Sequence, residues 1–350
     1  MTAARPLGVV VIGAGYFAGF HIDAWARMAE VALLGIADLA PETARAQALR
    51  VGLPDLALSG EAATLLAETK PAIVDIAAPP TAHADLIASA LAARPRAIVC
   101  QKPFCGSLEE ATRMTAEAEA AGIPLIVHEN VRFQPWYRAM KQALDRGLLG
   151  ELYQASFRLR PGDGQGPAAY LDRQPYFQAM QRFLVHETAI HWVDTFRFLL
   201  GEPQSVFADL RRLNPAIAGE DAGFILFRYS DGRRALFDGN RLADHAAANR
   251  RLTMGEALLE GSAASLSLNG EGDLSLRAFG DLSSRPVGGD YPKTGFGGEC
   301  VQALQQHVVD HLTRGTTLEN EARAYLRNLA IEAAIYRSSE SGAAVTLEGP

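Results

Sequence analysis

A short glycine-containing segment near the start of the chain has the residue types of a dinucleotide-binding turn. Gly13-Ala14-Gly15-Tyr16-Phe17-Ala18 follows the apolar run Val9–Ile12 and precedes a stretch with helical character. The first glycine suits a tight turn, the second lets a pyrophosphate approach the backbone, and the alanine allows close packing of helix on strand. The amino end of that helix would face the phosphate charge. We therefore expect a dinucleotide to bind at Gly13, Gly15, Tyr16, Phe17 and Ala18.

An acidic residue at the end of the second apolar run indicates which dinucleotide. Asp38 lies twenty residues after Ala18, where a carboxylate accepts hydrogen bonds from the adenosine ribose hydroxyls. The same charge would repel a 2′-phosphate, and Leu39-Ala40 offers no cation in its place. The sequence therefore predicts NAD rather than NADP. The alternative is an ordinary turn followed by a surface aspartate. That alternative does not explain why the strand, the spacing and the acidic residue occur in combination.

Three polar residues share one face of a predicted helix over Glu187–Leu200. Glu187 and His191 are four residues apart, and His191 and Asp194 are three apart, so they occupy neighbouring helical positions. An imidazole, with an ordinary pKa of about 6.5, suits a general base working near neutral pH. The alternative is a structural histidine with a capping carboxylate.

The remaining histidines and the cysteines form no metal-binding pattern. His186 and His191 are five residues apart, which separates them by about 140° around an α-helix and does not match the HExxH zinc motif. His307 and His311 have the right spacing but no third ligand nearby. The cysteines, Cys100, Cys105 and Cys300, fit neither a zinc nor a disulfide framework. We expect no metal and a reducing compartment.

The pattern of apolar residues changes near residue 130. Before it, short apolar runs alternate with amphipathic stretches, which is typical of a parallel sheet covered on both faces. After it, successive strand-like runs with short turns indicate a mostly antiparallel sheet. We expect an α/β fold, with a doubly wound Rossmann domain over residues 1–129 and a second α/β domain over residues 130–350. The expected strands are Leu7–Ile12, Val31–Asp38, Ile73–Ala77, Ala97–Gln101 and Pro124–His128, then Leu152–Leu159, Ser205–Leu210, Phe224–Tyr229, Arg234–Asp238, Leu252–Glu260, Ser265–Leu268 and Leu274–Phe279.

Length and charge exclude several classes of protein. The chain has 350 residues and a formal net charge of −7, and only four of its 33 basic residues are lysines. The length predicts two domains with large cores. The absence of a basic cluster argues against nucleic acid as a partner. No apolar run approaches about 18 residues, and the first residues show no signal-peptide pattern, so we expect a cytoplasmic protein without a membrane span.

Four further segments carry a resemblance to a known family. They are Ala78-Pro79-Pro80-Thr81-Ala82-His83, Gln101-Lys102-Pro103, Asn130-Val131-Arg132-Phe133 and Glu187-Thr188-Ala189-Ile190-His191-Trp192-Val193-Asp194. In this order the chain resembles, essentially end to end, the Gfo/Idh/MocA oxidoreductases, which act on sugars and polyols. The resemblance implies a Rossmann domain and a C-terminal domain with a large open sheet. That sheet usually forms the subunit interface, which implies a homodimer or homotetramer.

The resemblance also implies catalytic roles. Lys102 becomes the active-site lysine that binds the substrate hydroxyl, and its place at the end of the fourth strand agrees with where doubly wound sheets bind ligands. His191 becomes the general base, supported by Glu187. The family usually has glutamate at Gln101 and aspartate at Glu187, so this chain lacks one charge and carries one longer carboxylate, by roughly 1.5 Å. Cofactor contacts are implied for Pro79, His83, Gln101 and Lys102.

The expected substrate contacts are less specific. Arg158 and Arg160 alternate onto one face of the strand Leu152–Leu159, and by resemblance that face looks into the active site. Solvated arginines are the alternative. The complete set of expected substrate residues is Asn130, Arg132, Arg158, Arg160 and Asp194. Aromatic residues at 170, 176 and 177 are candidates for covering a sugar, although such residues are more often core.

We therefore expect an NAD-dependent dehydrogenase that oxidises a hydroxyl of a small sugar or polyol by hydride transfer to nicotinamide, in the cleft between the two halves. The resemblance is nearest to the aldose-oxidising branch, so an aldose such as D-apiose, oxidised to its lactone, is the first expectation and an inositol-type polyol the second. Two other classes remain as alternatives. A non-catalytic NAD-sensing regulatory protein would have lost Lys102 and His191, and an NAD-dependent glycoside hydrolase would accumulate no NADH.

Overall fold

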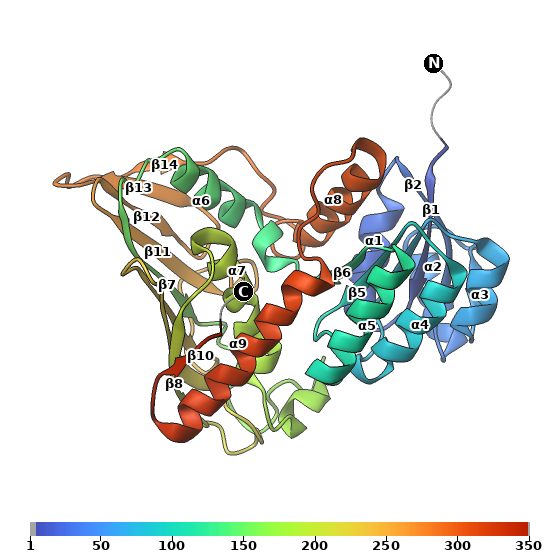
Figure 1. Ribbon diagram of the computed structural model, residues 1–350, viewed down its shortest axis with the longest axis horizontal. Helices are drawn as coiled ribbons and strands as arrows, with labels where there is room; N and C mark the ends of the chain where they lie inside the picture. The colour runs from blue at the N-terminus through green and yellow to red at the C-terminus, as the bar shows by residue number, and fades with distance from the viewer. Residues whose placement is uncertain (1–4, 349–350) are drawn as a thin grey trace. The chain divides into compact units, whose positions relative to one another are not determined.

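The computed structural model describes residues 5–348, and the chain divides into two compact units (Figure 1). The first unit runs to Asn130 and also contains Val301–Leu326. The second contains Val131–Cys300 and the chain from Arg327 onward. The single boundary expected after residue 129 thus leaves out one segment near the C-terminus. This segment joins the first unit because its helix packs there: the Gln305 side chain donates to the carbonyl oxygen of His21 at 3.2 Å.

The first unit contains a six-stranded sheet in the order β3-β2-β1-β4-β5-β6, with every neighbouring pair parallel. This order is that of a dinucleotide-binding fold, and the predicted doubly wound sheet is confirmed. The strands are β1 (Leu7–Ile12), β2 (Val31–Ala37), β3 (Ala57–Ser59), β4 (Ile73–Ile76), β5 (Ala97–Gln101) and β6 (Leu125–His128). The expectation missed β3, which has three residues and no buried position.

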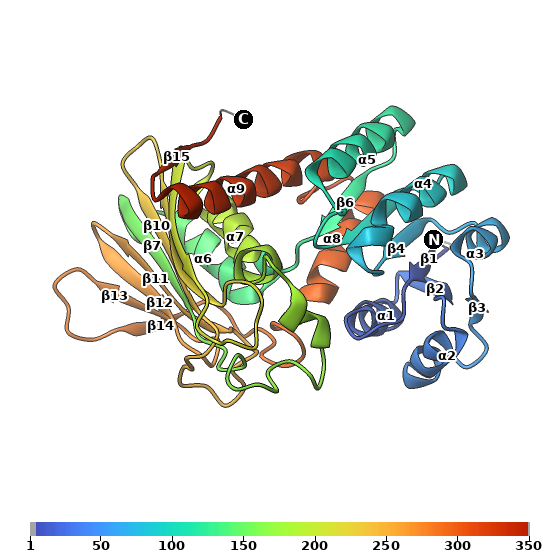
Figure 2. The ribbon, with the colours of Figure 1, turned by 90° about the horizontal axis from the view of Figure 1, so that it is seen from below.

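Helices cover both faces of this sheet. Figure 2 shows α3, α4 and α5 on one face and α1 and α2 on the other. The central strands are consequently buried on both sides, with Val9, Val10 and Val11 all at 0% exposure. This explains their continuous apolar runs. The helices are α1 (Ala18–Ala26), α2 (Pro41–Arg50), α3 (Ala62–Thr69), α4 (His83–Ala93), α5 (Leu108–Ala121) and α8 (Cys300–Arg314), with a short 3₁₀ turn η1 (Pro80–Ala82).

The second unit contains a nine-stranded sheet in the order β14-β13-β12-β11-β7-β10-β9-β8-β15. Its neighbours are antiparallel except for β7 and β10, which are parallel. The strands are β7 (Leu152–Leu159), β8 (Ser205–Arg211), β9 (Ala222–Arg228), β10 (Arg234–Asn240), β11 (Gly255–Gly261), β12 (Ala264–Leu268), β13 (Leu274–Ala278), β14 (Arg285–Val287) and β15 (Val345–Thr346). The predicted, mostly antiparallel sheet is confirmed. The short edge strands β14 and β15 were not predicted.

Only one face of this second sheet is covered by helices among the residues described. Figure 2 shows α6, α7 and α9 on that face, where Phe157 of β7 stacks on Trp192 of α7 with ring centroids 4.0 Å apart. Ala155, Phe157 and Leu159 of β7 therefore point to the helices, and Ser156 and Arg158 to the open face. The helices are α6 (Pro135–Asp145), α7 (Ile190–Leu200) and α9 (Ala322–Ser341), with 3₁₀ turns η2 (Val131–Phe133) and η3 (Pro175–Ala179) and a π-helix η4 (Leu184–Ala189).

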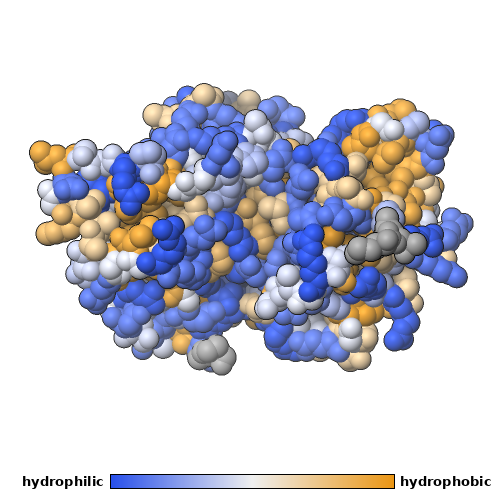
Figure 3. Space-filling view, turned by 90° about the horizontal axis from the view of Figure 1, so that it is seen from above, coloured by the Kyte–Doolittle hydropathy of each residue, from blue (hydrophilic) through white to orange (hydrophobic). Residues whose placement is uncertain are grey.

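The surface is mixed in character. On the face shown in Figure 3, hydrophilic residues are spread over both units, with hydrophobic residues in patches between them. No helix within residues 5–348 is both long enough and apolar enough to cross a membrane.

Candidate active site

The turn after β1 has the backbone geometry that close approach of a phosphate requires. Gly13 has a φ of +107°, and a Cβ at this residue would lie 2.5 Å from the carbonyl oxygen of Ala77. A Cβ on Gly15 would meet nothing within 4 Å. Packing therefore requires glycine at the first position, and the second borders open space in which a pyrophosphate fits. Ala18, at 1% exposure, lets α1 lie close to the sheet as expected.

Asp38 follows β2 directly and is tied to this turn. Its Oδ2 accepts the backbone N–H of Ala14 at 2.7 Å, and its Oδ1 accepts that of Ala40 at 2.8 Å. Each carboxylate oxygen retains a lone pair for a further donor, so the same side chain remains able to accept hydrogen bonds from ribose hydroxyls. Leu39, beside it, is 95% exposed. The donors and acceptors of this segment therefore fit NAD.

The loops around the turn divide into exposed and buried positions. Tyr16 is 45% exposed beside Gly15, and Pro79 is exposed just before η1, so both have surface available for a cofactor. His83 is 0% exposed, and its Nε2 lies 2.8 Å from the carbonyl oxygen of Ala78. Burial lowers the pKa of His83, so we interpret it as a neutral side chain that holds this loop from beneath rather than a cofactor contact.

Lys102 is positioned by the strand that precedes it. β5 ends at Gln101, and Lys102 follows at the carboxyl edge of the sheet, half-buried. The Oε1 of Gln101 accepts the backbone N–H of Lys102 at 2.6 Å. This edge is where doubly wound sheets bind their ligands, and the placement agrees with the role expected for this lysine.

Sequence reasoning missed a row of polar side chains beneath this edge. His21, Asp75 and His128 are all at 0% exposure, on α1, β4 and β6. Asp75 Oδ2 accepts the indole N–H of Trp25 at 2.6 Å and lies 2.8 Å from His21 Nδ1. The one available signal was an aspartate inside the otherwise apolar run Ile73–Ile76.

The end of β6 presents a second polar position. Asn130 is 2% exposed, and its Nδ2 has no hydrogen-bond partner among the described residues. A buried amide without a partner is costly in a folded protein, and at this edge a polar ligand would satisfy it. Beside it, Glu129 is fully buried and accepts the Tyr325 hydroxyl at 3.2 Å. Sequence reasoning named Asn130 and missed Glu129.

In the second unit, the segment carrying Glu187 begins as a π-helix rather than an α-helix. The sequence predicted an α-helix from Glu187, whereas η4 covers Leu184–Ala189 and α7 follows from Ile190. Single π-turns are frequent at functional sites. The i→i+5 bonding widens this turn, so the angles expected for α-helical spacing do not apply between residues 186 and 191.

Buried groups stabilise the π-helix from both sides. The carboxylate of Glu220 accepts the backbone N–H groups of Phe183 and Val185, each at 3.1 Å, and the hydroxyl of Tyr336 at 2.7 Å. Arg241, 3% exposed, donates to the Thr188 hydroxyl at 2.6 Å. The Glu220 carboxylate thus satisfies backbone N–H groups at the start of the helix, which have no partner within it, and so stabilises the irregular turn.

Glu187 and His191 are half-exposed, while Thr188, Ala189 and Ile190 between them are buried. The predicted pair therefore reaches a surface of the second unit. Tyr176, 57% exposed, lies close enough for the Glu187 charge to act on it: burial, and then that charge, raise the pKa of Tyr176 to about 12. Of the three aromatic candidates for covering a sugar, Tyr170 and Phe177 are core residues at 2% and 3% exposure.

Asp194 has a structural role that the sequence did not predict. It is 1% exposed, and its carboxylate accepts hydrogen bonds from Nε and Nη2 of Arg132, both at 2.6 Å, and from Nδ2 of Asn328 at 2.8 Å. The expected substrate residues Arg132 and Asp194 are thus brought together, but as a buried ion pair. We interpret Asp194 as the residue that holds Arg132, because its oxygens face protein donors rather than a ligand.

The substrate contacts expected for Arg158 and Arg160 stay predictions, and in this structure both arginines have protein partners. Arg158 lies on the side of β7 opposite the face on which α7 packs, and Arg160 directly follows the strand. Arg158 is exposed and pairs with Glu256 at 3.4 Å, and Arg160 donates to the carbonyl oxygen of Asp238 at 2.7 Å. The alternation was predicted correctly, but the packing of Phe157 against Trp192 decides which parity faces the helices.

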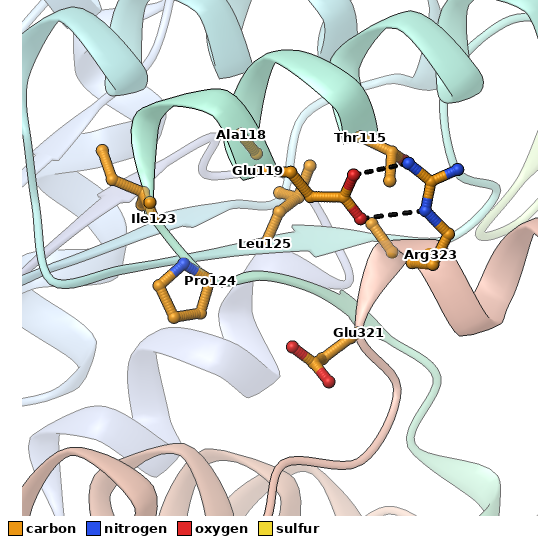
Figure 4. Close-up of a pocket in the computed structure, with 10 residues that line it drawn as sticks. Thr115, Ala118, Glu119, Ile123, Pro124, Leu125, Glu321 and Arg323 are labelled. Atoms are coloured by element: carbon orange, nitrogen blue, oxygen red, sulfur yellow. Dashed lines mark hydrogen bonds and ion pairs between the residues drawn. The ribbon is translucent and has the colours of Figure 1, made fainter.

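The described residues hold no further site that competes with these. Between residues 5 and 348, no three His, Cys, Asp or Glu side chains are grouped to hold a metal ion, and His186 pairs with Glu332 at 2.7 Å. A cavity of about 240 Å³ lies beside α5. Figure 4 shows its apolar lining at Ile123, Pro124 and Leu125 and the Glu119–Arg323 ion pair beside it. It lies at the amino end of β6, away from the edge that binds ligands.

The architecture is that of an NAD-dependent oxidoreductase: a Rossmann unit with an acid after its second strand, joined to an open-sheet unit that carries a carboxylate–histidine pair. Residues 7–129 match the GFO/IDH/MocA oxidoreductase family with its NAD-binding Rossmann fold, and residues 137–258 match the GFO/IDH/MocA C-terminal domain. The chain belongs to this family.

Three curated relatives are similar to this chain in sequence. The chain is 31% identical to a D-apiose dehydrogenase of Paraburkholderia graminis over 97% of its own length and 89% of the relative's. It is 30% identical to a D-apiose dehydrogenase of Rhizobium rhizogenes, over 96% of both chains. An inositol 2-dehydrogenase of Rhizobium meliloti is 28% identical over 67% of this chain and 69% of that protein.

Among solved structures, an oxidoreductase from Agrobacterium radiobacter in complex with NAD⁺, L-tartaric acid and magnesium is similar over 98% of both chains, with a TM-score of 0.85 and 28% identity. A levoglucosan dehydrogenase in complex with NADH and levoglucosan aligns over 99% of this chain and all of that one, with a TM-score of 0.82 and 21% identity. At 21% identity, the similarity to the levoglucosan dehydrogenase shows a shared fold.

Asp38 provides a direct test of cofactor choice. We expect Asp38→Asn combined with Leu39→Arg to lower the NAD-to-NADP ratio of kcat/KM by roughly tenfold or more, because a repelling charge is removed and a cation is added. Asparagine keeps one acceptor oxygen, for the N–H of Ala14 or of Ala40, and loses the other, so the ratio of the two cofactors rather than the absolute rate is compared. The measurement is NADH and NADPH formation under the same conditions. Asp55→Asn, on an exposed turn, is the control, and an unchanged ratio in the double variant would contradict the assignment.

Proposed function

We propose that this protein oxidises the anomeric hydroxyl of D-apiose or a closely related aldose to the lactone, with NAD as the acceptor. The observation that carries the proposal is a half-exposed Glu187–His191 pair in a chain similar along nearly its whole length to two D-apiose dehydrogenases. An inositol-type polyol is the second candidate, because an inositol 2-dehydrogenase is similar over 67% of the chain.

The residues of this chain divide the chemistry between them. Lys102 donates a hydrogen bond to the reacting hydroxyl and stabilises negative charge as it develops on that oxygen. His191 accepts the hydroxyl proton, since a neutral imidazole is a suitable base near neutral pH. Glu187 orients His191 or binds a neighbouring hydroxyl. Arg132, held by Asp194, and Asn130 are the remaining candidates for substrate contacts.

The reaction balances without another reactant. The C–H bond of the anomeric carbon breaks, its electron pair leaves as hydride, and the O–H proton goes to His191 as the carbonyl of the lactone forms. Bound NAD supplies the hydride acceptor at nicotinamide C4. Residues after β1 and β2, chiefly Gly13, Gly15 and Asp38, would hold it, as the open space above Gly15 supports.

A panel of aldoses and polyols with NAD and NADP tests the proposal. We expect NADH absorbance to rise with D-apiose and acid to be released as the lactone hydrolyses. Turnover with inositols alone would favour the second candidate. Tight NAD binding without turnover of any sugar or polyol would favour the regulatory alternative. Release of an aglycone from glycosides without net NADH would favour the glycoside hydrolase.

We further propose that two or four copies associate through the open face of the nine-stranded sheet. Leu236 of β10 and Leu258 of β11 lie on that face, at positions that only partly bury them within one chain. Leu258→Arg is expected to reduce the molecular mass measured by light scattering, because it adds a charge at the centre of the face. Leu108→Arg, on exposed α5, is the control. A variant that keeps the parental mass would contradict this interface.

We also propose that the protein works in the cytoplasm. Within residues 5–348 its three cysteines are buried and none forms a disulfide, as is usual where thiols stay reduced. Cell fractionation that recovers the protein elsewhere would contradict this placement.

A further inference from the structure

A buried row of side chains connects α1 to Gln101, whose side chain accepts the backbone N–H of Lys102. His21 on α1 lies between Asp75 of β4 and Gln101 of β5, with 2.8 Å from its Nδ1 to Asp75 Oδ2 and 3.3 Å from its Nε2 to Gln101 Nε2. All three are at most 7% exposed. Polar groups buried this deeply are retained at a cost unless their hydrogen bonds are satisfied.

The hydrogen bonds of the row determine where each proton lies. Asp75 Oδ2 already accepts the indole N–H of Trp25 at 2.6 Å, so the imidazole nitrogen facing it is the donor. With the proton on Nδ1, Nε2 of His21 is an acceptor. The opposite atom of Gln101 must then be its amide N–H, which agrees with Gln101 Oε1 accepting the Lys102 N–H at 2.6 Å.

Two uncharged groups and one carboxylate surround the ring of His21. The ring of His128 lies against it with centroids 4.0 Å apart, and burial lowers the pKa of His128 well below its ordinary value. From α8, the side chain that approaches is the uncharged amide of Gln305, which donates to the His21 carbonyl oxygen. Asp75 is thus the single charged partner described for this ring, and one Nδ1 proton satisfies it.

We propose that His21 is a positioning residue for Lys102, acting through Gln101. His21, which donates from Nδ1 to Asp75, fixes the amide of Gln101, and that amide fixes the first peptide N–H beyond β5. A glutamine without this partner would rotate, and the turn bearing Lys102 would lose its fixed direction. The inference rests on the role proposed for Lys102, but the placement of the proton on His21 does not.

The position of the imidazole proton of His21 is measured in the unmodified full-length protein. Long-range ¹H–¹⁵N correlation of protein labelled at its histidines distinguishes the two neutral tautomers and the imidazolium. The His21 signals are identified by cross-relaxation with the Trp25 indole proton, which shares Asp75 Oδ2. We expect the Nδ1–H tautomer. An Nε2–H tautomer or an imidazolium at neutral pH would overturn the proposal, whatever the substrate proves to be.

Kinetics test whether His21 acts through Gln101. We expect His21→Leu and Gln101→Met each to lower kcat by roughly tenfold, as misplacement of a catalytic group does, and His21→Leu to leave the Kd for NAD unchanged. The double variant should be no slower than the slower single variant, because the two act as one unit. His21→Gln, which keeps an acceptor, should recover part of the loss.

A packing control separates this role from a structural one. Ile22→Ala removes a neighbouring side chain of α1 that is also at 0% exposure, and we expect it to lower stability while leaving kcat near that of the parent. Losses from His21→Leu and Gln101→Met that multiply in the double variant would overturn the proposal, as would a kcat loss of equal size in the control. If no substrate is turned over, the tautomer measurement decides alone.

Discussion

Replacing His191 or Lys102 with alanine is expected to lower kcat by at least about 100-fold, the range typical of a lost general acid–base group. His191→Ala removes the acceptor of the hydroxyl proton, and Lys102→Ala removes the donor that stabilises the oxygen. Because His191 is not among the expected cofactor contacts, the Kd for NAD should stay unchanged in His191→Ala, whereas Lys102→Ala removes an expected cofactor contact and should raise it. Steady-state rates and NAD titration measure the two effects separately.

Matched substitutions on the surface serve as controls. Lys141, which pairs with Asp145 in α6, and His311, which binds the carbonyl oxygen of Thr316, are chemically the same residue types at sites remote from the chemistry. Lys141→Ala and His311→Ala should retain parental rates. If His191→Ala or Lys102→Ala were nearly as active as these controls, the assigned roles would be refuted. A large kinetic isotope effect with anomeric deuterium in the slow variants would show that hydride transfer limits them.

Removing the carboxylate of Asp194 should have the largest effect on stability. Asp194→Ala leaves Arg132, with 13% of its side chain exposed, as a poorly solvated charge without its partner. Breaking a buried pair in this way costs about 3–5 kcal/mol. The variant should unfold at lower urea concentration, and activity should fall as well because α7 carries both Asp194 and His191.

A double-mutant cycle distinguishes loss of the Asp194–Arg132 ion pair from simple loss of packing. Asp194→Leu combined with Arg132→Met removes both charges and should be much less destabilised than Asp194→Ala alone, since no buried charge is left. Glu256→Ala breaks the exposed pair with Arg158 and should cost about 1 kcal/mol or less. An Asp194→Ala variant as stable as Glu256→Ala would contradict the buried-pair interpretation.

The fold was largely readable from local pattern. Continuous apolar strands reflect constraints that act over a few residues, and the six-stranded parallel sheet confirms the fold that they predicted. Strands β3, β14 and β15 were missed because they have two or three residues each and little burial, so their pairing partners rather than their own side chains stabilise them.

The site was only partly predictable, and the errors have specific causes. Alternation along β7 was visible, but nothing in the run itself tells which parity faces a helix; Phe157 on Trp192 settles that, and Arg158 turns out to lie on the other side. The π-helix depends on Glu220, more than thirty residues away in the chain. Asp194 was read from helical spacing, whereas its partners come from residues 132 and 328.

The sequence by itself determined the class of fold, the nucleotide-binding turn with its acid, and the identity of Lys102, Glu187 and His191 as candidates. The fold class and the turn follow from residue types at short spacings, which local backbone geometry converts into structure, whereas the three candidates follow from the resemblance to a known family. Only the tertiary structure decided which polar side chains are buried against one another: Asp194 with Arg132, and His21 with Asp75 and Gln101. Such pairs join segments distant in the chain, and desolvation, which makes their hydrogen bonds obligatory, exists only after the units have folded.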